Sequence, residues 1–63
     1  MHEFDYVNDL GFHKRLVVDI KENDKYPVTL WDMEHGEYCG SGNMTAQELN
    51  EFLAHYGIEE RMD

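Results

Sequence analysis

Four apolar residues near the C-terminal end of the chain repeat with the spacing of one helix face: Leu49, Phe52, Leu53 and Tyr56. Thr45 precedes this stripe as an N-cap residue, and Glu48, three positions later, completes a capping box. Gly57 suits the left-handed position that ends many helices, and the apolar residue after it fits a Schellman ending. These signals predict a C-terminal helix within residues 45–57, running from about Ala46 to Tyr56.

The central part of the chain alternates between apolar and polar residues with a period of two. This alternation predicts strands over residues 13–21 and 26–32, joined by the polar turn 22–24. A second turn, Met33-Glu34-His35-Gly36, leads to a short third strand over residues 37–40, and the glycine-rich segment 40–43 is expected to be a flexible connector to the helix. Residues 3–7 also alternate, so the first ten residues are expected to form either an N-terminal strand or a loosely ordered arm.

These elements predict a single α+β domain over residues 1–63: a small antiparallel β-meander of three or four strands with one C-terminal helix packed on one face. One face of the predicted sheet supplies the apolar side chains that the helix stripe covers, namely Leu16, Val18, Ile20, Val28, Leu30 and Tyr38. The opposite face is expected to carry Val17, Thr29, Trp31 and Cys39 among charged residues.

Charge narrows the class of partner. The chain holds 14 Asp and Glu against 5 Lys and Arg, a formal net charge of −9 over 63 residues. Residues 26–63 hold eight acids and one base, which gives −7, and the first 25 residues hold the remaining −2. Because contacts to phosphate need Lys and Arg, this excess disfavours direct binding to nucleic acid or to anionic lipid. It favours attraction to a protein with a basic surface.

Candidate chemistry is sparse. His35 and Cys39 are four residues apart, but a zinc site needs more ligands than this spacing provides. A single cysteine excludes an internal disulfide framework, and the segment Gly40-Ser41-Gly42 lacks the lysine and the glycine spacing of a phosphate-binding loop. We therefore expect no metal, no cofactor and no catalytic residues, and a protein that is not an enzyme. No apolar run is long enough for a membrane span, so a cytoplasmic location is expected.

Trp31 is the most informative single residue of the chain. As a strand residue on the face opposite the helix, it belongs to one of two arrangements. In the first, an N-terminal aromatic or aliphatic residue (Phe4, Tyr6, Leu10 or Phe12) folds over it and forms a second small core. In the second, Trp31 is the anchor of a binding surface, because Trp and Tyr are enriched at interaction hot spots.

The combined features favour a small, acidic, non-enzymatic protein-binding module. By analogy of size and charge, we expect a phage or mobile-element inhibitor or modulator whose carboxylates mimic phosphates and occupy the basic nucleic-acid-binding surface of a host or defence protein. The expected partner-binding residues are Trp31, Asp32, Glu34, Glu37, Glu48, Glu51, Glu59 and Glu60. The alternative is a structural or assembly module that forms homodimers through the Trp31 sheet face or a strand edge.

Overall fold

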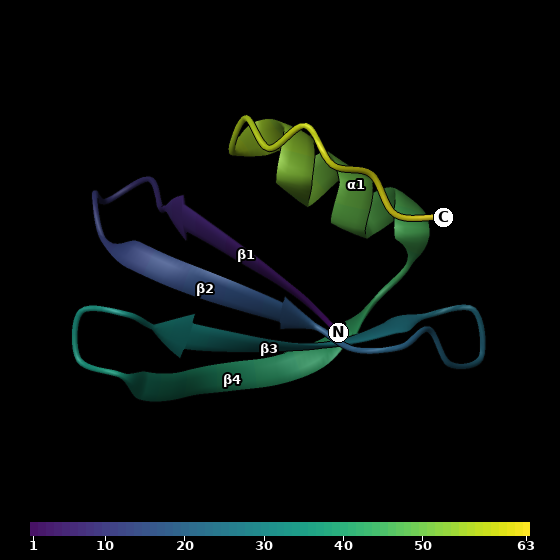
Figure 1. The fold of residues 1–63 in the computed structure, drawn as a ribbon, viewed down its shortest axis with the longest axis horizontal. Coiled ribbons are helices and arrows are strands. Elements are labelled where there is room, and N and C mark those ends of the chain that lie inside the picture. Colours follow the sequence, from purple (N-terminus) through teal and green to yellow (C-terminus); the bar gives the residue numbers. More distant parts are fainter.

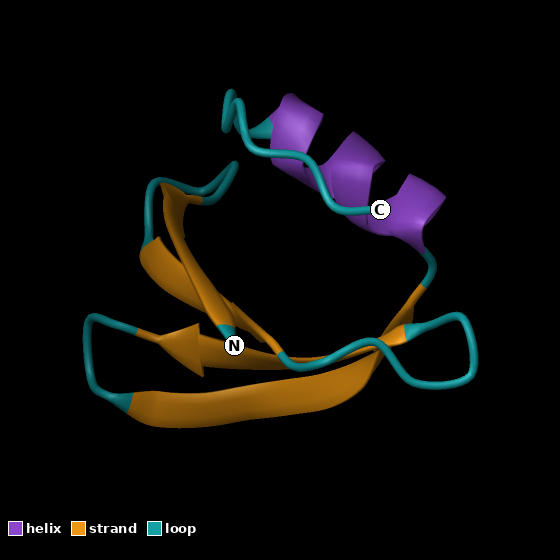
Figure 2. Cartoon of the chain, turned by 45° about the vertical axis from the view of Figure 1, so that its right-hand side comes forward, coloured by secondary structure: helices purple, strands orange, loops and turns teal.

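Four antiparallel strands form one sheet in the order β1-β2-β3-β4, and one helix follows them (Figure 1). The computed structural model describes residues 1–63. The elements are β1 (His2–Val7), β2 (His13–Val18), β3 (Tyr26–Asp32), β4 (Glu37–Met44) and α1 (Ala46–His55). The predicted meander with a C-terminal helix is confirmed, and the N-terminal segment is a strand, not a loose arm. The sheet curves beneath the helix, which covers one face only (Figure 2).

Helix α1 begins and ends as its sequence predicts. The Thr45 hydroxyl accepts a hydrogen bond from the Glu48 backbone N–H at 3.1 Å, and the Glu48 carboxylate accepts one from the Thr45 backbone N–H at 2.8 Å. At the other end, Gly57 has φ of 71°, and the Ile58 N–H donates to the Leu53 carbonyl at 2.9 Å. Both ends therefore satisfy backbone groups that a helix would otherwise leave unpaired.

Replacing Thr45 with alanine should lower the free energy of unfolding by about 1 kcal/mol, because the first turn of α1 loses its capping hydroxyl. Chemical denaturation monitored by circular dichroism measures this change. Thr45→Ser keeps the hydroxyl and serves as the control, so it should unfold close to the wild type. Equal stability of the alanine variant and the wild type would show that the capping box contributes nothing.

The link between β2 and β3 corrects the prediction for residues 13–21. Strand β2 ends at Val18, and the turn proper is a two-residue one in which Asn23 and Asp24 both have positive φ, 51° and 64°. Val18 pairs with Val28, and Glu22 pairs with Lys25. Three residues lie between Val18 and Glu22, whereas only two lie between Lys25 and Val28. The extra residue breaks the alternation. Ile20 is therefore 79% exposed, and its predicted place in the core is wrong.

Strand β4 corrects two further predictions. The segment 40–43, expected to be a flexible connector, is paired with β3 as part of an eight-residue strand, because backbone hydrogen bonding does not need apolar side chains. A bulge then interrupts the register, since Leu30 pairs with Gly40 whereas Trp31 pairs with Tyr38. The bulge moves Tyr38 out of the expected core face, and its side chain is 59% exposed.

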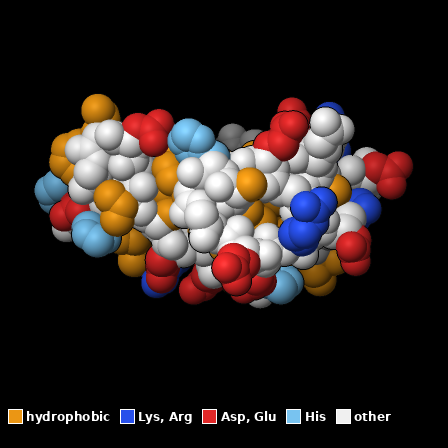
Figure 3. Space-filling view, turned by 90° about the horizontal axis from the view of Figure 1, so that it is seen from above, with side chains coloured by type: hydrophobic (Ala, Val, Ile, Leu, Met, Phe, Trp, Pro, Cys, Tyr) orange, Lys and Arg blue, Asp and Glu red, His pale blue; other side chains and the backbone are white.

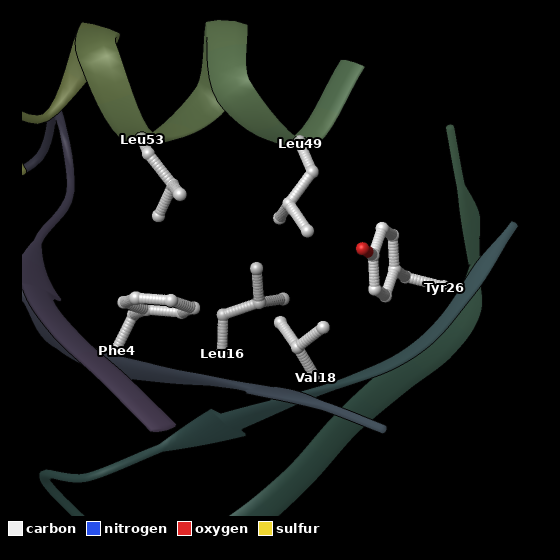
Figure 4. Close-up of a cluster of buried hydrophobic side chains, with 6 residues drawn as sticks. All are labelled: Phe4, Leu16, Val18, Tyr26, Leu49 and Leu53. Carbon is white, nitrogen blue, oxygen red and sulfur yellow. The ribbon is translucent and has the colours of Figure 1, made fainter. Parts of the chain in front are cut away.

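The core lies between the concave face of the sheet and α1. Six side chains are buried in it: Phe4, Leu16, Val18, Tyr26, Leu49 and Leu53. In Figure 4, Leu49 and Leu53 point from the helix toward Phe4, Leu16 and Val18 on the strands, and Tyr26 closes one end. Val28 and Leu30 are only partly buried beside this cluster. The strand residues that face the helix are thus largely those that the alternation predicts.

The segment after α1 returns along the helix (Figure 1). The Asn50 side chain donates to the Met62 carbonyl at 2.8 Å and accepts from the Met62 N–H at 2.7 Å. The Tyr26 hydroxyl and the Lys21 ammonium both donate to the Asp63 carbonyl. Ile58 and Met62 pack against the core, so this segment fastens the helix to the sheet.

Candidate binding surface

The outer face of the sheet, opposite α1, carries no second layer (Figures 1 and 2). Antiparallel register places Arg15, Trp31 and Tyr38 next to one another across three strands on this face. The Trp31 and Tyr38 rings meet edge to face with their centroids 6.0 Å apart. Trp31 is partly buried, and Tyr38 is more than half exposed. The aromatic pair is thus accessible on an uncovered sheet face, near the end where β3 leads into β4.

No N-terminal residue forms a second core over Trp31. Phe4 is buried beneath α1, and the Tyr6 ring packs against Phe52 with the ring centroids 5.1 Å apart. Leu10 and Phe12 lie in the turn between β1 and β2 and are 80% and 50% exposed. The arrangement in which one of these residues covers Trp31 is therefore wrong. The even-numbered residues of β1 share the face of Leu16, which is the helix-covered face.

A shallow hollow of about 320 Å³ marks the outer face beside Trp31. Apolar and charged side chains line it together with one glycine: Glu3, Arg15, Val17, Trp31, Met33 and Gly36. We call the four residues Val17, Trp31, Met33 and Tyr38 the Trp31 surface. The hollow is open and shallow, so it suits a protruding side chain of a partner better than an enclosed small ligand.

Sequence reasoning missed three exposed apolar residues at the same end of the sheet: Val7, Leu10 and Phe12. They lie in or next to the β1–β2 turn, and the β3–β4 turn lies beside it, since the Met33 N–H donates to the His13 carbonyl at 3.0 Å. Figure 3 shows hydrophobic side chains gathered at this end of the molecule. The available signal was the pair of apolar residues, Leu10 and Phe12, inside a turn whose conformation Asn8 and Gly11 set. Exposed apolar residues in a turn favour an interaction surface.

Carboxylates lie around the Trp31 surface, and several of them accept hydrogen bonds from specific residues. Asp5 accepts from Arg15 Nε at 2.7 Å and from Nη2 at 3.2 Å, and this pairing lowers the pKa of the Asp5 carboxyl. Asp32 is held by the His35 ring at 2.9 Å and by the Glu34 backbone N–H at 2.8 Å, and these hydrogen bonds lower the pKa of Asp32. Both groups therefore stay ionised to a lower pH than free carboxyls do.

Besides Asp32, six acidic residues are expected to bind the partner, and they divide into two groups. Glu34 and Glu37 lie in and next to the β3–β4 turn, close to Trp31 in the chain, and the Glu34 carboxylate accepts from the His13 backbone N–H at 2.9 Å. Four others lie on the helix side of the molecule: Glu48, Glu51, Glu59 and Glu60. Glu48 belongs to the capping box, and its hydrogen bonds to Thr45 lower its pKa. Figure 3 shows acidic side chains spread over the helix side of the molecule rather than in one cluster.

The eight expected binding residues therefore do not all share one surface. Trp31, Asp32, Glu34 and Glu37 are grouped around one end of the sheet, where β3 leads into β4. Glu48 is close to the other end of β4, because α1 starts directly after that strand (Figure 1). The first group combines an aromatic side chain with acidic residues around it, and an aromatic centre with a polar rim is typical of protein interfaces.

Residues with metal-binding or nucleophilic side chains do not converge. No three His, Cys, Asp or Glu residues lie together in a metal-binding arrangement. Cys39, in the β4 bulge, has its Sγ 4.0 Å from the Lys14 Nζ, and His35 instead pairs with Asp32. No helix of the chain is long and apolar enough to cross a membrane.

Comparisons with protein-family models, with curated proteins and with solved structures gave no match to this chain.

Proposed function

We propose that this protein is a non-enzymatic binding module that uses the Trp31 surface to engage a protein with a basic surface. The observation that supports this most directly is the accessible Trp31–Tyr38 pair on an uncovered sheet face. Trp and Tyr are enriched among the residues that contribute most to binding free energy, because they bury large rigid areas at little entropic cost. Exposed Met33 extends the same surface.

Charge supports a basic partner. No Lys or Arg occurs between residues 33 and 60, whereas six Glu residues do. Near the Trp31 surface, the guanidinium of Arg15 is paired with Asp5 and lies 3.6 Å from Glu3, so its charge is largely compensated. A basic partner is attracted over a distance of about 10 Å at ordinary ionic strength and then held by the apolar contacts.

In its specific form, the proposal is that the protein inhibits or modulates its partner by covering a nucleic-acid-binding surface. Carboxylates then occupy positions that phosphates take in the nucleic-acid complex, and the protein blocks access by steric and electrostatic means. Such a mechanism needs no cofactor and no reacting group. The abundance of carboxylates and the lack of a convergent reactive cluster support this form.

A pull-down from a lysate of the source organism tests this function. Tagged wild-type protein and Trp31→Ala are incubated in parallel at low and at high salt, and captured proteins are identified by mass spectrometry. We expect the wild type to capture a basic nucleic-acid-binding protein at low salt and to lose it at high salt. Capture that is equal for Trp31→Ala, or only of proteins without basic surfaces, would contradict the proposal.

Self-association is the second candidate function, and the open edge of β4 favours it, because an unpaired strand can accept a second copy. The net charge of −9 on each copy opposes it through repulsion. Sedimentation velocity over a range of protein and salt concentrations separates the two functions. A dimer that strengthens with salt, together with no captured partner, would favour self-association.

A further inference from the structure

Strand β4 forms an open edge of the sheet. It pairs only with β3, and both ribbon views show no segment along its other side (Figures 1 and 2). Every second backbone N–H and C=O of an edge strand points away from the sheet. Natural edges are often protected by Lys or Pro, and β4 contains neither. The opposite edge, β1, is charged by Glu3 and Asp5.

An apolar groove runs beside this edge on the concave face. It measures about 300 Å³, and Leu16, Val28, Leu30 and Met44 line it together with residues 40–43 of β4. The groove exists because two of the β4 positions that face this side are glycines, Gly40 and Gly42, which pair with Leu30 and Val28. The side chains of Val28 and Leu30 are thus left only partly covered.

Gly42 serves no purpose that the fold itself explains. Its φ is not positive, and a Cβ built on it would meet no atom within 4 Å. Gly40, by contrast, has φ of 145° next to the bulge, which favours glycine there. A glycine inside a strand weakens the strand and often marks a place where another backbone approaches closely. The space above Gly42 is therefore available to a partner.

We propose that β4 accepts an extended segment of the partner protein as a fifth strand, with apolar and basic residues alternating along it. The apolar side chains enter the groove above Gly40 and Gly42, and the basic side chains lie on the outer face next to Tyr38. This inference rests on the proposed function for the partner's positive charge. The charge also selects against a second copy, because each copy carries −9 and residues 33–60 hold no base.

The two faces of β4 match the apolar and the basic residues of such an alternating segment. On the concave side, Val28, Leu30 and Met44 offer apolar contact. On the outer side, the exposed Tyr38 ring and its neighbour Trp31 offer aromatic faces that attract cations. Main-chain hydrogen bonds to the β4 edge give affinity, and the alternation gives selectivity.

An NMR titration of the ¹⁵N-labelled full chain tests this inference. The probe is a blocked heptapeptide that alternates lysine and valine, and the control is a heptapeptide of the same composition with its lysines and valines in separate blocks. We expect the alternating peptide to shift the amide signals of Glu37–Met44 and slow their hydrogen exchange. The block peptide should shift them at least tenfold less at equal concentration.

Two matched variants locate the groove. Gly42→Leu fills it, and because a Cβ there meets no atom, the variant should keep the wild-type melting temperature or exceed it. Its affinity for the alternating peptide should fall at least tenfold. Ala54→Leu adds a leucine side chain at an exposed position of α1, outside the groove and the β4 edge, and should retain binding.

The inference is overturned by equal shifts with both peptides, by shifts spread over the amide signals of α1, or by unchanged peptide affinity of Gly42→Leu. Concentration-dependent protection of β4 without peptide would assign the edge to a second copy and would also overturn it. If the peptide fails to dock while the pull-down still depends on Trp31, strand addition is wrong and the proposed function stands. If the peptide docks but the pull-down captures no basic partner, the proposed function is wrong and strand addition at β4 stands.

Discussion

Replacing Leu53 with alanine is expected to lower the free energy of unfolding by about 2–5 kcal/mol. Leu53 is fully buried and points from α1 into the cluster formed with Phe4 and Leu16 (Figure 4). A domain of this length has a total stability of about 3–9 kcal/mol, so this loss is most or all of it. Thermal unfolding followed by circular dichroism should show a large fall in melting temperature, or no folded state.

The matched control is Leu10→Ala, which removes the same atoms from a side chain that is 80% exposed. Its free energy of unfolding should stay within about 0.5 kcal/mol of the wild type. An unchanged melting temperature for Leu53→Ala would contradict the packing of α1 on the sheet through Leu53. Phe52→Ala should lie between the two, since Phe52 is partly buried and packs against Tyr6 and Tyr56.

Replacing Trp31 with alanine is expected to weaken partner binding by about 2 kcal/mol or more, which is about 30-fold in Kd. Trp31 is the largest side chain of the Trp31 surface and lies between Arg15 and Tyr38 on the uncovered face. Because the outer face has no second layer, the variant should still fold, with a smaller loss of stability than Leu53→Ala. Isothermal titration with the captured partner measures the affinity.

Val17→Ala is a useful companion, because it truncates a smaller side chain of the same hollow, and its effect should be several-fold weaker. Circular dichroism of both variants separates loss of binding from loss of fold. Wild-type affinity of a folded Trp31→Ala would show that the aromatic pair is not the anchor. The acidic residues or the β4 edge would then have to provide the contacts.

The sequence predicts the elements of this fold well, because each one depends on local patterns. The capping box at Thr45 and the ending at Gly57 are encoded within a few residues, and α1 follows them closely. The alternation likewise predicts two strands, over residues 13–21 and 26–32; β3 matches the second range, and β2 covers the first part of the first range. Local hydrogen-bond and apolar patterns suffice for such features.

Predictions failed where a single extra residue changes the register. One extra residue before the Asn23–Asp24 turn exposes Ile20, and the bulge before Gly40 exposes Tyr38. A bulge has no reliable local signature, so alternation read straight through it assigns the wrong face. Strand β4 was missed at residues 40–43 because its pairing comes from β3 and not from its own β propensity.

The candidate site was predicted only in part, because alternation gives the sheet face of a residue but not what covers that face. Trp31 and its place on the face opposite the helix follow from alternation, and so do the neighbouring acids of the β3–β4 turn. Which residues cover a sheet face is a tertiary property, and the exposure of Leu10 and Phe12 shows that none covers this one. The separation of Glu48 from Glu34 and Glu37 also depends on the direction in which α1 leaves β4.

The acidic charge exceeds what solubility needs and costs stability through self-repulsion, so a binding role would explain it. Four carboxylates without a structural hydrogen bond are suitable for reversal to lysine: Glu37, Glu51, Glu59 and Glu60. Each reversal adds two positive charges, so the fourfold variant changes the net charge from −9 to −1. Exposed charges each contribute little to stability, so this variant should remain folded.

The association rate constant with the captured partner, measured by stopped flow over a range of salt concentrations, tests the central claim most directly. For the wild type, we expect the rate constant to fall steeply as salt rises, because opposite charges steer the encounter. The fourfold variant should associate more slowly at low salt and show a much flatter dependence. If the folded fourfold variant associates at the wild-type rate with the wild-type salt dependence, the acidic surface has no role in recognition, and the account of a basic partner is wrong.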